Sequence, residues 1–450
     1  MGRSVALITN RVGFYDGISG GGSAMREKLL ASLKEEGHHV ICLSAGKNDM
    51  KVTDSVRGPY LRSSFHNLNV VRKVLSRSDL LIVSGSYTPL WAFGVILCRF
   101  FYKIPTVFIC TMNADKAVAT WENGTWSQSI AWHLFTLNDF VTSSLCEHTY
   151  TRSVEHARKL RSDFGMDIDG IMVQPDQYKC FSRPSSRHHF EQREEARSWL
   201  MNGNTHDGKN LLLFAGRLIP EKRIHLLVQS KPDNCVLAIV GAVTSETERE
   251  FVMKLHNPKA GVYVHVGFVR QPRLCQLYWA ADAHVSASDY ETLGNTVHES
   301  LLCGTPVVVE NAGGYISQVS CAKNQGCLVD FTDKDAVHAA LEQVFSIHGC
   351  TATDKNHTFS FRCKPLPRGE VVDGKEIVRS IFQASNTVKK ETITVNGVVS
   401  FMKDKIALVR ILVLIMYLLV LNFFYSQFAC DRKEKEYIKK SASETIQKIT

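Results

Sequence analysis

Two glutamates placed eight positions apart have the spacing in this chain most suggestive of chemistry. Glu291 and Glu299 stand in SDYETLGNTVHES, where an acidic loop leads into a helix that we expect over about 293–303. Eight helical steps span on the order of 12 Å, roughly the distance from a sugar, past a diphosphate, to a ribose. The pair could therefore accept hydrogen bonds from two sets of hydroxyl groups on one ligand. On spacing alone, an ordinary surface glutamate of a helix is the favoured interpretation of Glu299.

The surroundings of this pair favour a ligand. The start of a helix offers free backbone N–H groups that suit phosphate or sugar hydroxyls, and Gly294 has no side chain to block the approach. Earlier in the chain, Arg217 and Lys222 follow a strand-like run in FAGRLIPEK. Two cations at the end of a strand can clamp a pyrophosphate and offset the charge of a departing nucleotide.

The elements that must position these residues are short strands alternating with helices. The strand-like runs are SVALITN, HHVICLS, DLLIVSG, PTVFICT and DFVTSS in the first half, and LLLFAGR, VLAIVG, VYVHVG, DAHVSAS and TPVVVE in the second. This alternation predicts an α/β fold with parallel, doubly wound sheets. Ligands of such sheets bind outside the carboxyl ends of the strands, so we expect a ligand between two facing Rossmann-like lobes.

A polar stretch at 182–210 marks the boundary between the lobes. We predict a first Rossmann-like lobe over 1–185, a second over 207–345, each built like a nucleotide-binding sheet, and a poorly patterned connecting segment over 346–402. Each of the two lobes is long enough to form its own core.

An apolar run near the C-terminus predicts a membrane anchor. Residues 406–425, IALVRILVLIMYLLVLNFFY, have the length of a bilayer-spanning helix. We place the transmembrane helix at 403–428 and a polar tail at 429–450; a helix buried in a soluble core is the alternative. Basic residues on both flanks leave the orientation open. Because the N-terminus lacks the pattern of a signal peptide, we expect a single-pass membrane protein with cytosolic catalytic lobes.

The composition argues against some classes of binding partner. The chain has 450 residues, 44% of them hydrophobic, and a formal net charge of +9. The basic residues are scattered and form no tract, which argues against nucleic acid. The 13 cysteines are irregularly spaced without a CxxC pair, as expected of reduced thiols. We expect no metal and no cofactor; Asp167 and Asp169, in MDIDG, mimic a metal motif that arises readily by chance.

Together these motifs resemble the family-4 retaining glycosyltransferases of GT-B fold. The marks of that family are a Gly-Arg element with Lys five residues later and two glutamates separated by seven residues, and the resemblance covers most of residues 1–345. It implies that Arg217 and Lys222 bind the donor diphosphate, that Glu299 holds the ribose and that Glu291 contacts the donor sugar. Glu291, Arg217 and Lys222 would be the catalytic residues.

The resemblance also implies substrate-binding positions around this centre. The backbone after Glu291 would close on sugar or phosphate, over Thr292, Leu293, Gly294 and Asn295. In the first lobe, DGISGGGSAMREKL resembles the family's glycine loop, which would bring the diphosphate and acceptor close to Gly20, Gly21 and Gly22. Family members often carry a histidine near the donor sugar where this chain has FICTMNADK; Asn113 could hydrogen-bond a sugar there but could not carry a proton.

We therefore predict a retaining, metal-independent hexosyltransferase whose partners are a nucleotide sugar, a lipid or glycan acceptor and the membrane. The phrase ETLGN is similar to lipid-glycosylating members, including sulfoquinovosyltransferases and bacterial glycolipid transferases. Three alternatives stay open. They are a catalytically weak, membrane-anchored scaffold or binding subunit, a transferase for a soluble sugar, and another two-lobed enzyme such as a sugar-nucleotide epimerase.

Overall fold

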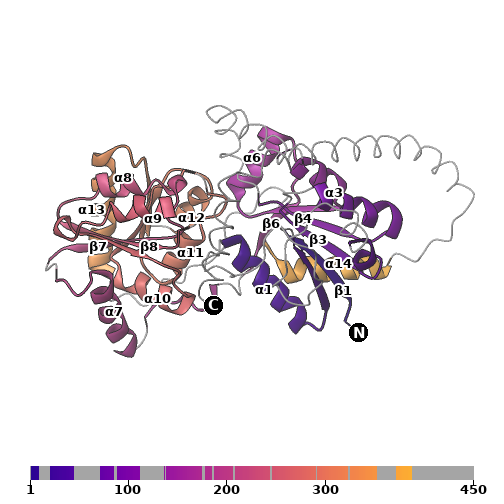
Figure 1. Cartoon of the computed structure of the whole chain (residues 1–450), viewed down its shortest axis with the longest axis horizontal. Coiled ribbons are helices and arrows are strands. Elements are labelled where there is room, and N and C mark those ends of the chain that lie inside the picture. The colour runs from indigo at the N-terminus through magenta and orange to yellow at the C-terminus, as the bar shows by residue number, and fades with distance from the viewer. Residues whose placement is uncertain are drawn as a thin grey trace, which may run out of the picture.

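The chain forms two α/β lobes, shown side by side in Figure 1. The computed structural model describes residues 2–9, 21–44, 71–85, 89–111, 136, 138–174, 178–184, 187–205, 208–243, 246–289, 291–322, 325–351 and 371–387. Every strand pairing between the named strands of the two sheets is parallel. The predicted pair of Rossmann-like lobes is therefore confirmed.

The first lobe is built on a sheet of order β13-β6-β5-β4-β3-β1-β2. Its strands are β1 (Ser4–Thr9), β2 (His39–Ser44), β3 (Leu80–Ser84), β4 (Thr106–Ile109), β5 (His148–Thr151), β6 (Gly170–Val173) and β13 (Val371–Asp373). Its helical elements are α1 (Gly21–Glu35), α3 (Pro89–Ile96), the π-helical turn η1 (Leu97–Tyr102), α6 (Val154–Phe164) and α14 (Gly374–Thr387). Central strands such as LLIVS are apolar throughout because helices cover both faces of a parallel sheet.

The second lobe has a sheet of order β12-β11-β10-β7-β8-β9. Its strands are β7 (Asn210–Ala215), β8 (Cys235–Gly241), β9 (Val262–Val266), β10 (Ala283–Ser286), β11 (Val307–Glu310) and β12 (Gly326–Val329). Its helices are α7 (Arg187–Leu200), α8 (Ile224–Gln229), α9 (Glu246–Met253), α10 (Gln271–Ala280), α11 (Asn295–Leu302), α12 (Tyr315–Cys321) and α13 (Lys334–Thr351), with short 3-10 turns η3 (Pro220–Lys222) and η4 (Pro258–Ala260). All five strands that the sequence indicates for this lobe are present.

One predicted strand is wrong. DFVTSS lies within helical residues 138–145, and the strand of this region is β5, a few residues later. Phe140 and Ser144, four residues apart, are exposed while Val141 and Thr142 are buried, which is the period of a helix. Ser144 donates its hydroxyl hydrogen to the Phe140 carbonyl oxygen at 2.8 Å, a bond that only the helical turn allows.

The chain returns to the first lobe after completing the second. β13 pairs with β6 at the edge of the first sheet, and α14 packs beside α1 in Figure 1. Ile377, Val378 and Ile381 of α14 share one buried cluster with Met25 and Leu29 of α1. Part of the segment that the sequence left unplaced, residues 371–387, therefore completes the first lobe.

The predicted anchor lies outside the described residues, which end at 387. Within the described part of the chain, no helix combines the length and apolar character needed to cross a bilayer.

Candidate functional site

The predicted catalytic residues meet at the carboxyl end of the second sheet. Glu291 lies in the loop after β10, and Lys222 ends η3, the turn after β7. β7 and β10 are adjacent in the sheet, so their following loops converge. The ammonium of Lys222 forms an ion pair with Oε1 of Glu291, and both side chains are about 15% exposed, at 15% and 16%. Lys222 also donates to Oγ of Ser288 at 3.3 Å.

A tyrosine also holds the Glu291 side chain in place. The Tyr315 hydroxyl donates to Oε1 of Glu291 at 3.3 Å and lies 2.8 Å from Oγ of Ser286. Burial raises the pKa of Tyr315 well above its ordinary value, so the hydroxyl keeps its proton. Glu291 is thus held from one side by a cation and from the other by a hydroxyl.

The helix expected from about 293 begins at Asn295, so Glu299 lies about one turn along α11, in a different environment. Oε2 of Glu299 accepts a hydrogen bond of 3.1 Å from the Tyr278 hydroxyl of α10. Burial raises the pKa of Glu299 to about 8, although the bond from Tyr278 favours the charged form. Glu291 keeps a cationic partner, whereas the partner of Glu299 within the described part of the chain is the Tyr278 hydroxyl. The two glutamates are therefore chemically distinct, which spacing alone could not indicate.

The segment between the glutamates requires its glycine. Gly294 has a φ of 81° and is the residue that precedes α11. A Cβ at this position would collide with the ring of Tyr315, so the left-handed backbone and the tyrosine both require glycine. A Cβ on Gly314 would lie 2.6 Å from Cα of Leu293. The glycine pair at the end of the motif therefore lets the loop after β11 approach the Glu291 loop.

Two hydrogen bonds join this segment to residues before the second lobe. Oγ of Ser153, at the start of α6 in the first lobe, donates to the Thr292 carbonyl oxygen at 2.5 Å. The Tyr178 hydroxyl donates to Oδ1 of Asn295 at 2.7 Å. The predicted substrate-binding stretch therefore lies where the two lobes meet.

The remaining predicted residues are placed less fully. Arg217 follows β7 by two residues, is exposed, and has no side-chain partner among the residues that the structure describes. Gly21 and Gly22 begin α1, so a helix N-terminus does follow the glycine loop. Gly20 and Asn113 lie outside the described residues. Arg217 stays a predicted diphosphate ligand, and the structure leaves its side chain available for one.

Sequence reasoning missed several residues that shape the site. Tyr278 and Tyr315 hold the two glutamates, yet each lies more than twenty positions from its partner and carries no local signal. Arg223, directly after Lys222, was also missed, although two consecutive cations in EKR were a usable signal. Within the described ranges, no three His, Cys, Asp or Glu side chains are grouped as a metal site would require.

Comparison with known proteins agrees with this geometry. Residues 198–356 match the family model for glycosyl transferases, group 1. A GDP-mannose-dependent alpha-mannosyltransferase of Mycolicibacterium smegmatis is 34% identical over 109 residues, which are 24% of this chain and 27% of the relative. A D-inositol 3-phosphate glycosyltransferase of Thermomonospora curvata is 31% identical over 208 residues, 43% of this chain and 47% of the relative. The chain thus spans less than half the length of either relative.

A solved structure extends the likeness to both lobes. Sucrose-phosphate synthase of Thermosynechococcus elongatus superposes with a TM-score of 0.57 at 18% identity, over 76% of this chain and 90% of that one. The two-lobed fold is therefore the GT-B fold. The segment that matches the family model, residues 198–356, contains both glutamates and both cations.

Proposed function

We propose that the protein is a retaining glycosyltransferase that moves a hexose from a nucleotide-diphosphate donor to a membrane-lipid acceptor, without a metal. The observation that carries the proposal is the ion pair between Lys222 and Glu291 at the meeting of the lobes, with Glu299 eight residues further along the chain, in α11. Lys222 and Glu291 thus meet at the start of a segment whose helix carries the second carboxyl group, that of Glu299.

Lys222 would stabilise the departing diphosphate. Its ammonium has three N–H donors, and Glu291 and Ser288 accept two of them. A third bond to a phosphate oxygen can therefore form without breaking the first two. Arg217, exposed at the same edge of the sheet, would bind a second phosphate oxygen. Preorganised cations of this kind lower the barrier because they need no rearrangement as charge develops.

The two glutamates would divide the recognition of the donor. Glu291 is held by Lys222 and Tyr315, so it presents a fixed oxygen to sugar hydroxyls. Glu299, whose pKa is about 8, would bind the ribose diol, and its ionisation would strengthen that contact. In this mechanism the acceptor attacks from the face that the nucleotide leaves. Neither glutamate needs to be a covalent nucleophile.

The acceptor and the location are inferred from the sequence outside the described residues. An apolar run of bilayer length at 406–425 would hold the lobes at a membrane surface, on the cytosolic side. A lipid-linked acceptor would then reach the site by diffusion in two dimensions.

Nucleotide release tests the proposal. The purified protein, with membrane lipids, is offered UDP-, GDP- and ADP-sugars, and Glu299→Ala and Arg217→Ala serve as site variants. Arg249→Ala on α9, whose side chain is 52% exposed and remote in sequence from the motifs, is the matched control. We expect release from one donor, abolished in both site variants and retained in the control.

Failure would take two forms. Nucleotide binding without release from any donor would favour a binding subunit that kept the fold and lost turnover. Full activity of a chain lacking residues 403–450, toward soluble sugars and in the absence of lipid, would overturn the lipid acceptor while leaving the transferase intact.

A further inference from the structure

Arg223 has an unusual backbone at a junction of the site. It lies between η3 and α8 with a φ of 45°, in the left-handed region that favours glycine. Among the described residues with φ in this region, only two others are not glycine, Lys103 and Asn202. A large side chain in this conformation persists where other contacts hold it.

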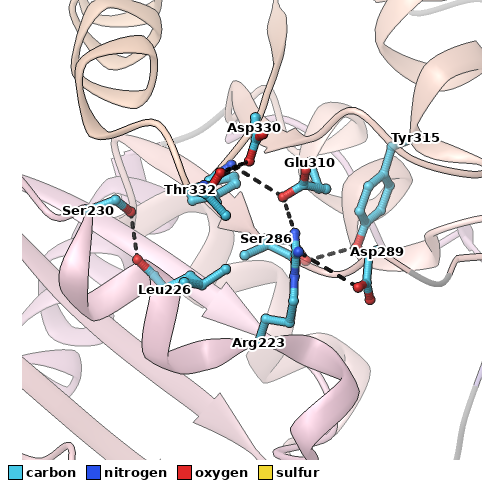
Figure 2. Close-up of polar contacts among 11 residues, drawn as sticks. Arg223, Leu226, Ser230, Ser286, Asp289, Glu310, Tyr315, Asp330 and Thr332 are labelled. Carbon is cyan, nitrogen blue, oxygen red and sulfur yellow. Dashed lines mark hydrogen bonds and ion pairs between the residues drawn. The ribbon is translucent and has the colours of Figure 1, made fainter. Parts of the chain in front are cut away.

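Those contacts are three groups on two neighbouring segments. Nε of Arg223 donates to the Ala287 carbonyl oxygen at 2.7 Å, and Nη2 pairs with Oε2 of Glu310. Nη1 lies 3.7 Å from Oδ2 of Asp289. Figure 2 shows the guanidinium reaching upward from its helix, toward Glu310 on one side and Asp289 on the other. One planar fork therefore joins the first residues of the Glu291 loop to the end of β11.

Glu310 gives this arrangement a rigid base. It is the last residue of β11 and is 8% exposed. Its Oε2 also accepts a hydrogen bond of 3.3 Å from the backbone N–H of Phe331, just after β12. Burial raises the pKa of Glu310, while Arg223 opposes that rise, so the guanidinium favours the charged carboxylate. Arg223 thus links the loop after β10 to the end of β11.

Consecutive cations hold alternating residues of one loop. Arg223 contacts Ala287 and Asp289, and Lys222 contacts Ser288 and Glu291. The two cations therefore fix the same short stretch of chain from neighbouring positions.

We propose that Arg223 is a positioning residue of the transferase reaction, fastening residues 287–289, which lead to Glu291, to Glu310 so that Glu291 is presented to the donor sugar in one fixed place. The inference rests on the proposed function for its catalytic consequence. It assigns no contact between Arg223 and the substrate, because the guanidinium is already occupied by Ala287, Glu310 and Asp289.

The positive charge of Arg223 has a second consequence, because it neutralises neighbouring carboxylates. Asp289, Glu291 and Glu310 place three carboxylates near the position proposed for a diphosphate. Without the guanidinium, two of them would repel an incoming phosphate and each other. Arg223 therefore also lowers the electrostatic cost of bringing an anionic donor to this edge of the sheet.

The test compares Arg223→Gly, Arg223→Ala and Arg223→Lys. Glycine removes the side chain while making the left-handed backbone easier, so misfolding of the turn cannot explain its effect. Lysine keeps the charge but loses the planar fork. Asn202→Gly is the matched control: Asn202 is exposed, has a φ of 51°, and makes the same backbone change away from the site.

We expect kcat of Arg223→Gly to fall roughly 10- to 100-fold, the range for a catalytic group displaced by about 1 Å. The donor KM should rise much less, because Lys222 and Arg217 remain. Arg223→Lys should recover part of the loss, and Asn202→Gly should match the wild type. Hydrogen exchange of peptides covering 287–295 should be faster in Arg223→Gly and Arg223→Ala, and unchanged in Asn202→Gly.

The two measurements separate the possible failures. Wild-type kcat and wild-type exchange in Arg223→Gly would overturn the inference, and so would lost activity with unchanged exchange. If the wild type releases no nucleotide from any donor, the proposed function fails. Faster exchange in Arg223→Gly would in that case still support the fastening of the loop by Arg223.

Discussion

The Tyr278 hydroxyl donates a hydrogen bond of 3.1 Å to Glu299, the glutamate whose pKa burial raises to about 8. Tyr278 is itself fully buried, and burial raises its pKa well above the ordinary value, so the hydroxyl keeps the proton that it donates. The bond stabilises the charged form of Glu299, which burial disfavours. Tyr278 therefore sets how readily Glu299 ionises.

Nucleotide binding should depend on pH through Glu299. If the carboxylate is the form that accepts from the ribose diol, affinity should rise as pH increases from about 6.5 to 8.5, the range around the raised pKa. Glu299→Gln should abolish this dependence, and Tyr278→Phe should move it to higher pH because the carboxylate loses its donor. Calorimetric titration with a nucleoside diphosphate at several pH values measures it. A pH-independent wild type would contradict the assignment.

The free energy of unfolding should fall as pH rises, whereas nucleotide affinity should increase. The folded pKa of Glu299, about 8, is above its ordinary value of 4.5. Between these values the folded state keeps a proton that the unfolded chain releases, so the contribution of Glu299 is complete below pH 4.5 and is lost as pH rises toward 8. Glu299→Gln should flatten this decline in urea denaturation midpoints. A decline equally steep in the variant would exclude Glu299 as its source.

Gly294→Ala should destabilise the second lobe more than an equivalent change in open space. Gly208 has a φ of 73°, and nothing lies within 4 Å of the place that an alanine Cβ would take there, so Gly208→Ala reports the left-handed backbone alone. That change should cost about 1–2 kcal/mol. Gly294→Ala should exceed it, because the methyl group must also displace the Tyr315 ring. If chemical denaturation gave equal losses of unfolding free energy for the two variants, the Tyr315 ring would move aside without an energetic cost.

The Lys222–Glu291 pair should show coupling in a double-mutant cycle. Lys222→Met leaves Glu291 largely buried without its cation, and Glu291→Gln does the converse. Each change should destabilise the protein by roughly 1–3 kcal/mol, somewhat below the loss for a completely buried pair. The double variant should lose less than the sum. Additive losses in the free energy of unfolding would mean that the two side chains do not interact in solution.

Ser153 should matter through its link between the lobes. Its Oγ accepts from the His156 backbone N–H at 3.2 Å as the cap of α6 and donates to the Thr292 carbonyl oxygen. Ser153→Ala loses both bonds and should cost about 1 kcal/mol in stability. Ser153→Asp can still cap the helix but cannot donate, so it should retain most of that stability while weakening donor binding. Unaltered donor binding in both variants would remove Ser153 from the site.

The sequence by itself determined the fold class and the short motifs of the candidate site. Parallel strands need apolar residues on both faces, and the helices between them need apolar residues at the helical spacing of about 3.6. Strands such as CVLAIVG can therefore be predicted without a structure. Likewise Glu291, Lys222 and Gly294 lie in short motifs whose members are near one another in the chain. DFVTSS failed because a short run with three β-branched or aromatic residues and two serines fits either element, and packing decided for the helix.

Only the tertiary structure decided which groups meet. Tyr278, Tyr315 and Glu310 reach the site from α10, α12 and β11. The order of the strands along the chain does not tell which of them are neighbours in a parallel sheet. The same holds for residues 371–387, whose amphipathic helix had no visible partner until the first sheet was complete. Local sequence specifies local conformation and periodicity; contacts between distant segments, and the pKa of a carboxyl group they bury, follow from the packing of the whole lobe.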